Sequence, residues 1–261
     1  MSTSPPVFST FENGVYTITL NRPQRANAFD YGMAKALQAA LKNAARDPQI
    51  RCVLLTGAGA VFSAGQDLSE VQSTESISYR EHMQRTYNPI ILQIRHLEKP
   101  VLAALKGAVA GAALGIALAC DMRIAAQNTL FTVGFLKVGL VPDSAVSLLL
   151  PAVIGLGQAS ELAFMNTPFD AEQALTWGLV NRVVPADDLD ALAFQWASEL
   201  TQGPVGTMGL TKRAFNKAVL PHLEQVLDYE AHLQAIAQHG DEHREGVRAF
   251  LEKRKPRFTG A

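Results

Sequence analysis

Two features in the middle of the chain could do chemistry together: a run of small residues from Gly107 to Ala119, and a lone carboxylate, Asp143, which follows Pro142. Gly111 and Ala112 have almost no side chain, so a ligand could approach the backbone closely. The LGIALA that follows is typical of a buried helix, whose first N–H groups would face that ligand. Free amides at the positive end of a helix dipole suit an oxygen atom that gains negative charge. The pattern is compatible with an oxyanion hole, but small residues more often serve tight packing of a helix on a sheet.

Asp143 has a structural explanation as well as a chemical one. It precedes SAVSLLL, which we predict to be a short helix, and aspartate is among the best residues for capping a helix. The same carboxylate could act as a base on a proton next to a carbonyl group. An exposed aspartate has a pKa of about 3.9, so a useful base needs an apolar wall that raises this pKa, and Phe135 and Leu140 are candidates. Cap and catalyst are compatible, so both remain open.

Several apolar segments predict the strands and helices that must position these residues. Strands are expected over VYTITL (residues 15–20), IRCVLLTG (50–57) and VLAALKG (101–107), with shorter ones at MRIAA and TLFTV. A helix over about residues 30–46 separates the first two strands, which indicates a parallel crossover. The turn AVFSAGQDL (60–68) leads into a polar loop, SEVQSTESISY, and then into a helix over about residues 80–96.

The second half of the chain is predicted to be mostly helical. Helices are expected at about residues 158–165, 170–177 and 187–200, with the strand LVNRVV between the last two. Gln202-Gly203-Pro204 is the best candidate boundary, and three helical segments follow it, near residues 205–219, 223–238 and 241–253. We therefore divide the chain into a core, residues 1–201, and a C-terminal helical region, residues 202–261.

Composition limits the classes of protein to consider. The chain has 261 residues, 48% of them hydrophobic, so it can bury a sizeable core without disulfides, and we expect Cys52 and Cys120 to be reduced core residues. A net charge of -1 provides no basic field for nucleic acid. The N-terminus does not resemble a signal peptide, and the longest apolar stretch is interrupted, so we expect no membrane association and a cytoplasmic location.

The sequence contains no convincing metal-binding or nucleotide-binding motif. His239 and His243 match a zinc-protease pattern, H-x-x-E-H, but Gly240 should break the helix that this pattern needs. G-x-S-x-G, a P-loop and cysteine pairs at metal-ligand spacing do not occur in the sequence. We therefore expect no metal site.

Four segments together resemble, in order and spacing, the enoyl-CoA hydratase/isomerase, or crotonase, superfamily. They are NRPQRANAF (21–29), VLLTGAGAVFSAGQDL (53–68), KPVLAALKGAVAGAALGIALACD (99–121) and ALTWGLVNRVV (174–184). The resemblance implies an α/β fold, a crotonase-like spiral of repeated β-β-α units, followed by a helical region that drives assembly into homotrimers or homohexamers. It also implies an acyl-CoA thioester as substrate and no cofactor, since coenzyme A is part of the substrate.

The same resemblance assigns roles to individual positions. It places two backbone N–H groups on the thioester oxygen, and these fall on Ala64 and Ala112. The coenzyme A nucleotide would lie against the segment at Arg25 and against the turn over residues 64–68. The substrate site implied in this way comprises Arg25, Ala26, Ala64, Gly65, Gln66, Asp67, Leu68, Gly111, Phe135 and Leu140.

The chain departs from the hydratase pattern at the two catalytic glutamates, which correspond here to Gly115 and Phe135. Neither residue can move a proton, whereas Asp143 stands where the isomerase branches carry their acidic residue. One carboxylate can take a proton from C2 of a substrate and return it to C4. The sequence therefore predicts an isomerase that converts 3-enoyl-CoA to 2-enoyl-CoA with Asp143 as acid and base, and little hydratase activity.

Three alternatives remain. The chain could be an isomerase of ring-modified aromatic-CoA esters, or a dehalogenase of aromatic-CoA esters with Asp143 as the nucleophile. The dehalogenase needs a histidine where this chain has Asn88, and His82 lies elsewhere on the same predicted helix. From another class, the chain could bind acyl-CoA without catalysis. The preferred acyl group, the choice between trimer and hexamer, and the role of Asp143 as base or nucleophile remain open.

Overall fold

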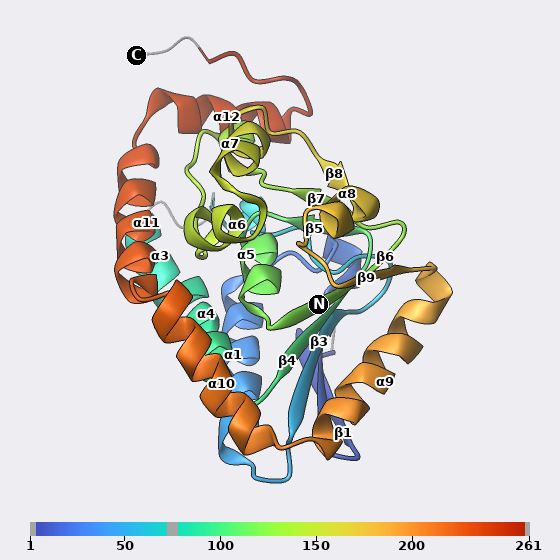
Figure 1. Cartoon of the computed structure of the whole chain (residues 1–261). Helices are drawn as coiled ribbons and strands as arrows, with labels where there is room; N and C mark the ends of the chain where they lie inside the picture. The colour runs from blue at the N-terminus through green and yellow to red at the C-terminus, as the bar shows by residue number, and fades with distance from the viewer. Residues whose placement is uncertain (1–3, 72–77, 259–261) are drawn as a thin grey trace.

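A six-stranded sheet forms the base of the fold in the computed structural model, which describes residues 4–71 and 78–258 (Figure 1). The strand order is β1-β2-β3-β4-β6-β9, with β1 and β2 antiparallel and every later neighbour parallel. The inner strands are nearly continuous apolar runs because both faces of the sheet are covered. The bounds are β1 Val7–Glu12, β2 Val15–Leu20, β3 Cys52–Gly57, β4 Val101–Leu105, β6 Met122–Ala126 and β9 Arg182–Val184.

A second, smaller sheet runs in the order β5-β7-β8, with bounds Ala108–Ala110, Leu130–Thr132 and Phe169–Asp170. The chain passes from a strand of the large sheet to a strand of the small sheet and then into a helix. It does so through β4, β5 and α5 (Ala112–Ala119), and again through β6, β7 and α6 (Val146–Ile154). This repeat confirms the predicted spiral of β-β-α units.

Helices cover both faces of the large sheet (Figure 1). On one face lie α1 (Tyr31–Arg46) and α4 (Tyr87–His96), and on the other lies α9 (Leu189–Gln202), whose Ala193 and Ala197 pack against Leu54 and Leu102. The remaining short elements are η1 Pro23–Arg25, α2 Leu68–Val71, η2 Phe135–Val138, α7 Leu156–Phe164, α8 Ala171–Thr176 and η3 Ala186–Asp188.

The single helix expected over residues 80–96 is wrong, because the structure contains two helices, α3 (Tyr79–Arg85) and α4, with a break at Thr86. Pro89 has no N–H to donate to the carbonyl group of Arg85 one turn earlier. That carbonyl instead accepts a hydrogen bond of 2.8 Å from Nε2 of Gln38 in α1. The polar loop predicted before this helix lies largely outside the described residues.

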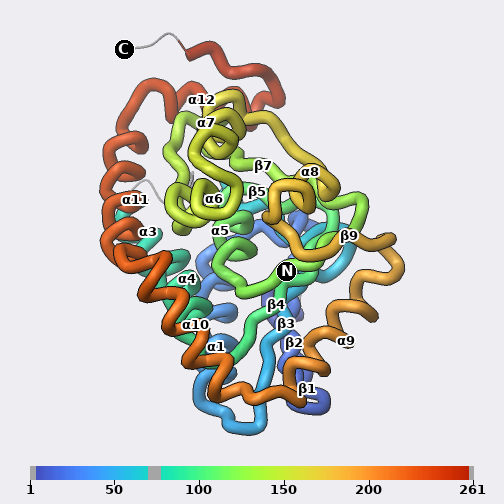
Figure 2. Tube along the Cα trace, viewed as in Figure 1, coloured from blue at the N-terminus to red at the C-terminus, as the bar shows by residue number. Residues whose placement is uncertain are grey.

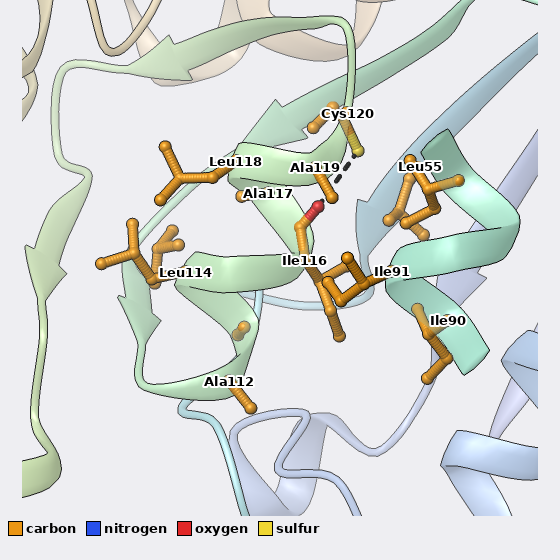
Figure 3. Close-up of a cluster of buried hydrophobic side chains, with 14 of the residues drawn as sticks. Leu55, Ile90, Ile91, Ala112, Leu114, Ile116, Ala117, Leu118, Ala119 and Cys120 are labelled. Atoms are coloured by element: carbon orange, nitrogen blue, oxygen red, sulfur yellow. Dashed lines mark hydrogen bonds between the residues drawn. The ribbon is translucent and has the colours of Figure 1, made fainter. Parts of the chain in front are cut away.

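Helix α5 is the centre of the core. All of its residues are buried, and Ile116 packs toward Ile90 and Ile91 of α4 (Figure 3). A helix that is apolar on every side belongs inside a fold, so the small residues have the packing role that the sequence allowed for. None of the described helices combines the length and apolar character needed to cross a membrane.

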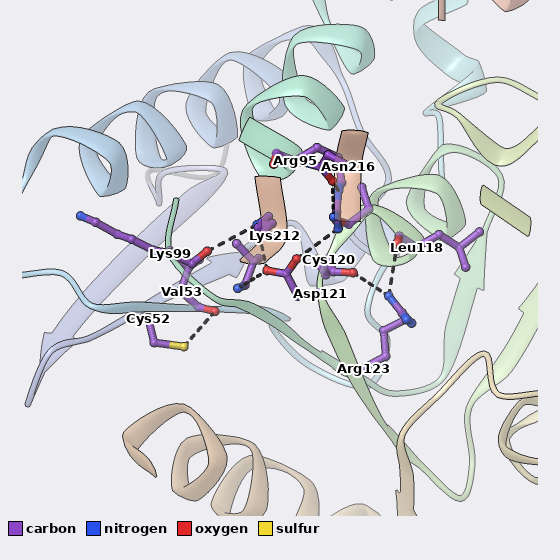
Figure 4. A network of polar contacts seen from close by, with 12 residues as sticks. Cys52, Val53, Arg95, Lys99, Leu118, Cys120, Asp121, Arg123, Lys212 and Asn216 are labelled. Atoms are coloured by element: carbon purple, nitrogen blue, oxygen red, sulfur yellow. Dashed lines mark hydrogen bonds and ion pairs between the residues drawn. The ribbon is translucent and has the colours of Figure 1, made fainter. Parts of the chain in front are cut away.

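Three C-terminal helices follow the predicted ranges closely: α10 Val205–Val219, α11 Leu223–Ala237 and α12 Asp241–Leu251. They run up one side of the molecule and across its top (Figure 2). Lys212 of α10 is fixed to the core, because Asp121 accepts from its Nζ at 2.8 Å and from Nη1 of Arg95 at 3.1 Å (Figure 4). Helix α11 packs on α3 and α6, and α12 packs on η2, so the C-terminal helices enclose the segment around Asp143.

Candidate active site

A cavity of about 940 Å³ lies between the small sheet, α3 and the C-terminal helices. Its walls include Ala112 at the start of α5, Asp143, and Gln234 of α11. This volume is at the upper end of the range for small-molecule sites. Of the substrate-site residues predicted from the sequence, Arg25, Ala64, Gln66, Asp67, Leu68, Gly111, Phe135 and Leu140 line the cavity.

The first amide of α5 is available at this cavity. Helix α5 begins at Ala112, after Gly111 with φ 57° and ψ -127°, a conformation that only glycine adopts easily. The N–H of Gly111 donates to the carbonyl of Thr132 at 3.1 Å, whereas the N–H of Ala112 has no acceptor among the described residues. The start of a helix leaves such donors unpaired, and they suit a negatively charged oxygen.

The second predicted donor needs a correction. The N–H of Ala64 donates to the carbonyl of Ala26 at 3.0 Å and is therefore occupied within the protein. Ala26 thus shapes the turn through its backbone and is not part of the cavity wall. The N–H of Gly65 is also engaged, with Oγ of Ser63 at 3.2 Å. The amide of Gln66, which stands between the engaged amides of Gly65 and Asp67, has no acceptor in residues 4–71 and 78–258.

Gly65 explains how the turn comes so close to α5. Its φ is +90°, and a Cβ atom there would lie 2.6 Å from the carbonyl oxygen of Ala110 and 3.7 Å from the amide nitrogen of Ala112. Ser63 binds the strand before Ala112 in both directions, donating to Ala108 at 3.0 Å and accepting from Ala110 at 3.2 Å. The turn with the free amide of Gln66 is therefore fixed beside the start of α5.

Asp143 is a buried acid, with 7% of its surface exposed. Its Oδ1 accepts a hydrogen bond from Oγ of Ser144, and its Oδ2 accepts one from Nε2 of Gln234, each at 2.7 Å. Burial raises the pKa of Asp143 to about 6, although these two hydrogen bonds act in the opposite direction. Phe135 and Leu140 share the cavity with this carboxyl, as the sequence analysis expected of wall residues.

The capping explanation for Asp143 is wrong. Helix α6 begins at Val146, and its first amides bind a different acid, Glu230 of α11. The carboxylate of Glu230 accepts from the N–H of Ala145 at 2.8 Å and from the N–H of Ser147 at 3.1 Å. The side chain of Asp143 is therefore free of this structural task.

Gly115 and Phe135, the two positions that the resemblance aligns with hydratase glutamates, leave no room for an acid or carry an apolar side chain. A Cβ atom on Gly115 would lie 2.3 Å from the carbonyl oxygen of Ser144, so the turn after Asp143 occupies the space of a side chain there. Phe135 presents an apolar ring to the cavity. Asp67 also lies on the cavity, where burial raises its pKa but hydrogen bonds from Ser69 and Arg22 outweigh that effect and keep the pKa low. Asp143 is thus the cavity-lining carboxyl with a raised pKa.

A histidine does reach the cavity, but not at the dehalogenase position. Asn88 points away from it and donates to the carbonyl of Leu227 at 3.2 Å. His82 lines the cavity, and its Nε2 lies 3.1 Å from Oε1 of Gln66, which also accepts from the hydroxyl of Tyr87. Burial lowers the pKa of His82, which favours the neutral ring.

Four features of this cavity were not predicted from the sequence: the free amide of Gln66, the cluster of His82 with Tyr87, the contact of Gln234 with Asp143, and the contacts of Glu230 with the turn after it. Gln234 and Glu230 are four residues apart in a predicted helix, which places them on one face. That spacing was the available signal, but it does not reveal that this face packs on the turn after Asp143.

Comparison with known proteins agrees with this geometry. The profile of the enoyl-CoA hydratase/isomerase family matches residues 10–261. The 1,2-epoxyphenylacetyl-CoA isomerase of Escherichia coli is 42% identical over 97% of this chain and 98% of its own. A probable enoyl-CoA hydratase of Rhodobacter capsulatus is 37% identical over 95% of both chains. The crystal structure of an enoyl-CoA hydratase from Mycobacterium avium subsp. paratuberculosis superposes with a TM-score of 0.89 at 33% identity, covering 98% of this chain and 99% of the other.

The family match covers nearly the whole chain, and the fold is the one that the resemblance implied. This chain belongs to the enoyl-CoA hydratase/isomerase, or crotonase, superfamily.

Proposed function

We propose that this protein is an acyl-CoA isomerase that moves a proton within its substrate, with Asp143 as the acid and base. The observation that carries the proposal is the buried carboxyl of Asp143, with a pKa of about 6, on a cavity that also contains the free amides of Ala112 and Gln66. Gly115 and Phe135 supply no second acid. One group that exchanges a proton near neutral pH suits an isomerisation.

The reaction has two proton transfers. The ionised carboxylate of Asp143 removes a proton from C2 of a 3-enoyl-CoA thioester, and the electron pair of the C–H bond spreads onto the thioester oxygen. The amides of Ala112 and Gln66 donate to that oxygen while it carries negative charge, and one such donor contributes about 3 kcal/mol. Asp143 then returns the proton to C4, which leaves the double bond between C2 and C3. No cofactor other than the coenzyme A of the substrate takes part.

Hydration is a poorer match for this site. It requires one group that deprotonates water and one that protonates C2 of the substrate. The turn at Ser144 fills the space beside Gly115, and Phe135 is apolar. The isomerase therefore accounts for the residues present, whereas a hydratase would need residues that are replaced.

A second candidate substrate is 1,2-epoxyphenylacetyl-CoA, because a relative that is 42% identical over 97% of the chain is an isomerase of this compound. The cavity has aromatic walls, including Phe135 and Tyr87, that suit a ring. This compound also carries C2 protons next to a thioester, so it presents the same group to Asp143. A dehalogenase reaction has less support, since Asn88 lies off the cavity.

The test compares the wild type with Asp143→Asn on 3-enoyl-CoA, 1,2-epoxyphenylacetyl-CoA and crotonyl-CoA, followed by absorbance of the products. We expect the wild type to isomerise one of the first two, the variant to lose about 100-fold or more of the rate, and crotonyl-CoA to remain unhydrated. Tight binding without turnover by the wild type would instead indicate an acyl-CoA binding protein. Hydration of crotonyl-CoA at a rate that Asp143→Asn leaves unchanged would refute the proposed function.

A further inference from the structure

Gln234 makes an unusual contact with the carboxylate of Asp143. It lies in α11, its side chain is buried, and its Nε2 donates to Oδ2 of Asp143 at 2.7 Å and to the carbonyl of Val141 at 2.8 Å. Its Oε1 is buried without a hydrogen-bond partner in the part of the chain that the structure describes. An unpaired buried acceptor costs free energy, so the amide holds this orientation because both hydrogens meet acceptors. A flipped amide would bring its oxygen against a carboxylate and a carbonyl.

Glu230 lies one turn earlier on the same face of α11 and holds the next residues of the turn. Ser144 and Ala145 have φ angles of 55° and 63°, a left-handed conformation that non-glycine residues adopt at a cost. The carboxylate of Glu230 accepts from the N–H of Ala145, and from both the N–H and the hydroxyl of Ser147. These bonds stabilise the strained turn that carries Asp143.

We propose that Gln234 is a positioning residue for Asp143, which orients the carboxylate toward the cavity and favours its ionised form, while Glu230 fixes the turn on which the carboxylate stands. A donor that binds a carboxylate stabilises the ionised form over the protonated form. Burial of Asp143 acts in the opposite direction, so the donor decides how much base is present near neutral pH. The catalytic consequence rests on the proposed function, whereas the contact itself does not.

Other titratable groups surround this segment and could obscure a titration that is followed by activity alone. Burial raises the pKa of Glu230 to about 7, against hydrogen bonds from Ser147 and Ala145. His82 of α3 and His243 of α12 both have pKa values lowered by burial, with a hydrogen bond to Val138 opposing the shift for His243. The other charged and titratable groups on the cavity walls are Arg25, Tyr31, Asp67, Tyr79, Arg85, Tyr87 and Lys137. The ionisation of Asp143 must therefore be measured at Asp143 itself.

The experiment labels the aspartate side-chain carboxyl carbons with ¹³C and follows their NMR signals against pH in the intact protein. The Asp143 signal is identified by its absence in Asp143→Asn. Gln234→Leu keeps the bulk of the side chain but removes the donor, and we expect it to raise the titration midpoint of Asp143 by about 1 pH unit or more. The matched control is Gln225→Leu, an exposed glutamine on the same helix, which should leave the midpoint unchanged.

A second variant, Gln234→Glu, keeps the shape of the side chain and places a carboxyl beside Asp143, so it should raise the midpoint as well. An unchanged midpoint in a folded Gln234 variant overturns the proposal. In assays of isomerisation, we expect Gln234→Leu to lower kcat by about 2-fold at pH 7 and by about 5-fold at pH 6, with most of the loss recovered at higher pH and little change in KM. A loss that is equal at every pH would show a merely structural role and would also overturn the proposal.

The NMR measurement needs no turnover. A wild type that isomerises none of the thioesters would refute the proposed function, while the midpoint in the Gln234 variants would still decide whether Gln234 controls the ionisation of Asp143.

Discussion

At the scale of single residues, Asp143 combines two opposing requirements, because its surroundings favour the protonated form and its proposed reaction begins from the ionised form. Burial is the main reason why the pKa of Asp143 lies at about 6, above the ordinary aspartate value of 3.8. Between these two values the folded state binds more protons than the unfolded state, so stability falls as the pH rises through this window and stays lower above it. The protein therefore loses stability by keeping this base ionised.

We predict that Asp143→Asn stabilises the protein at neutral pH while it abolishes turnover. The neutral amide removes the free-energy penalty of a buried charge, which is on the order of 1 to 3 kcal/mol for a shift of this size. Urea unfolding at about pH 7.5 should show the gain, and at about pH 3.5, where Asp143 is mostly protonated in both states, little of the gain should remain.

Asp67→Asn is a control whose effect on stability near neutral pH should have the opposite sign. The pKa of Asp67 is lowered in the folded state, so its ionised form adds stability above the unfolded pKa, and this contribution is lost as the pH falls. The Asn variant should thus be less stable than the wild type near neutral pH. If Asp143→Asn is also less stable there, the burial of Asp143 is not the dominant influence on its pKa.

Residue types and spacing predicted Asp143 and Ala112 as parts of one site, but not that the amide of Ala64 is engaged while that of Gln66 is free. The N–H of Ala64 is engaged because it meets the carbonyl of Ala26, which comes from a distant part of the chain. Local sequence carries no information about such a partner. The contacts that Gln234 and Glu230 make with the segment around Asp143 could not be predicted from the sequence for the same reason.

At the scale of elements, the contact between α5 and the turn after Asp143 depends on one residue without a side chain. A Cβ atom on Gly115 would lie 2.3 Å from the carbonyl oxygen and 2.7 Å from the Cβ atom of Ser144. Both neighbours belong to a strained turn that α11 holds from the other side. The turn can move only by giving up contacts that position Asp143.

We predict that Gly115→Ala lowers stability by about 1 to 3 kcal/mol, as overpacked cores do, and lowers kcat further than the loss of folded protein explains. Thermal unfolding and the isomerisation assay, both on purified folded protein, measure the two effects. Gly157→Ala in α7 is the matched control, because no atom lies within 4 Å of the added methyl group. That control should be neutral or slightly stabilising. Normal kcat in Gly115→Ala would show that the turn does not depend on this contact.

Strands and helices were predicted well where burial on one or both faces gives a clear periodicity, as in β3, β4, α1 and the three C-terminal helices. The break between α3 and α4 was missed, although Pro89 was visible in the sequence. A proline at this position is compatible with one helix that continues through it, and also with a second helix that starts shortly before it. The side chain of Gln38, which binds the freed carbonyl, decides between them.

At the scale of the whole molecule, the C-terminal helices have two apolar faces. Leu223 and Leu227 are buried within the chain, so these two residues are not available for contacts between subunits. Val226 and Leu233 are half-buried. The outer face of the same helices exposes other large apolar side chains, Leu210, Phe215, Val219, Tyr229 and Ile236.

Such a face on consecutive helices of a folded chain is typical of an interface. Figure 2 shows α10 and α11 following one another along one side of the molecule, away from the large sheet. We therefore predict that the protein is a homotrimer or homohexamer and that α10 contributes to the contact. Sedimentation at micromolar concentration should show the assembly, and a monomer would contradict it.

Phe215→Glu tests which helix makes the contact. Phe215 is 63% exposed, so the change should leave the fold of the isolated chain intact, yet it places a charge where the partner would bury an aromatic ring. We expect this variant to sediment as smaller species with an unchanged circular dichroism spectrum. Ala191→Glu adds the same charge to an exposed position of α9, a helix without large exposed apolar side chains, and should keep the wild-type assembly. If both variants assemble normally, the interface lies elsewhere, and the exposed Leu156, Phe164 and Met165 around α7 become the next face to change.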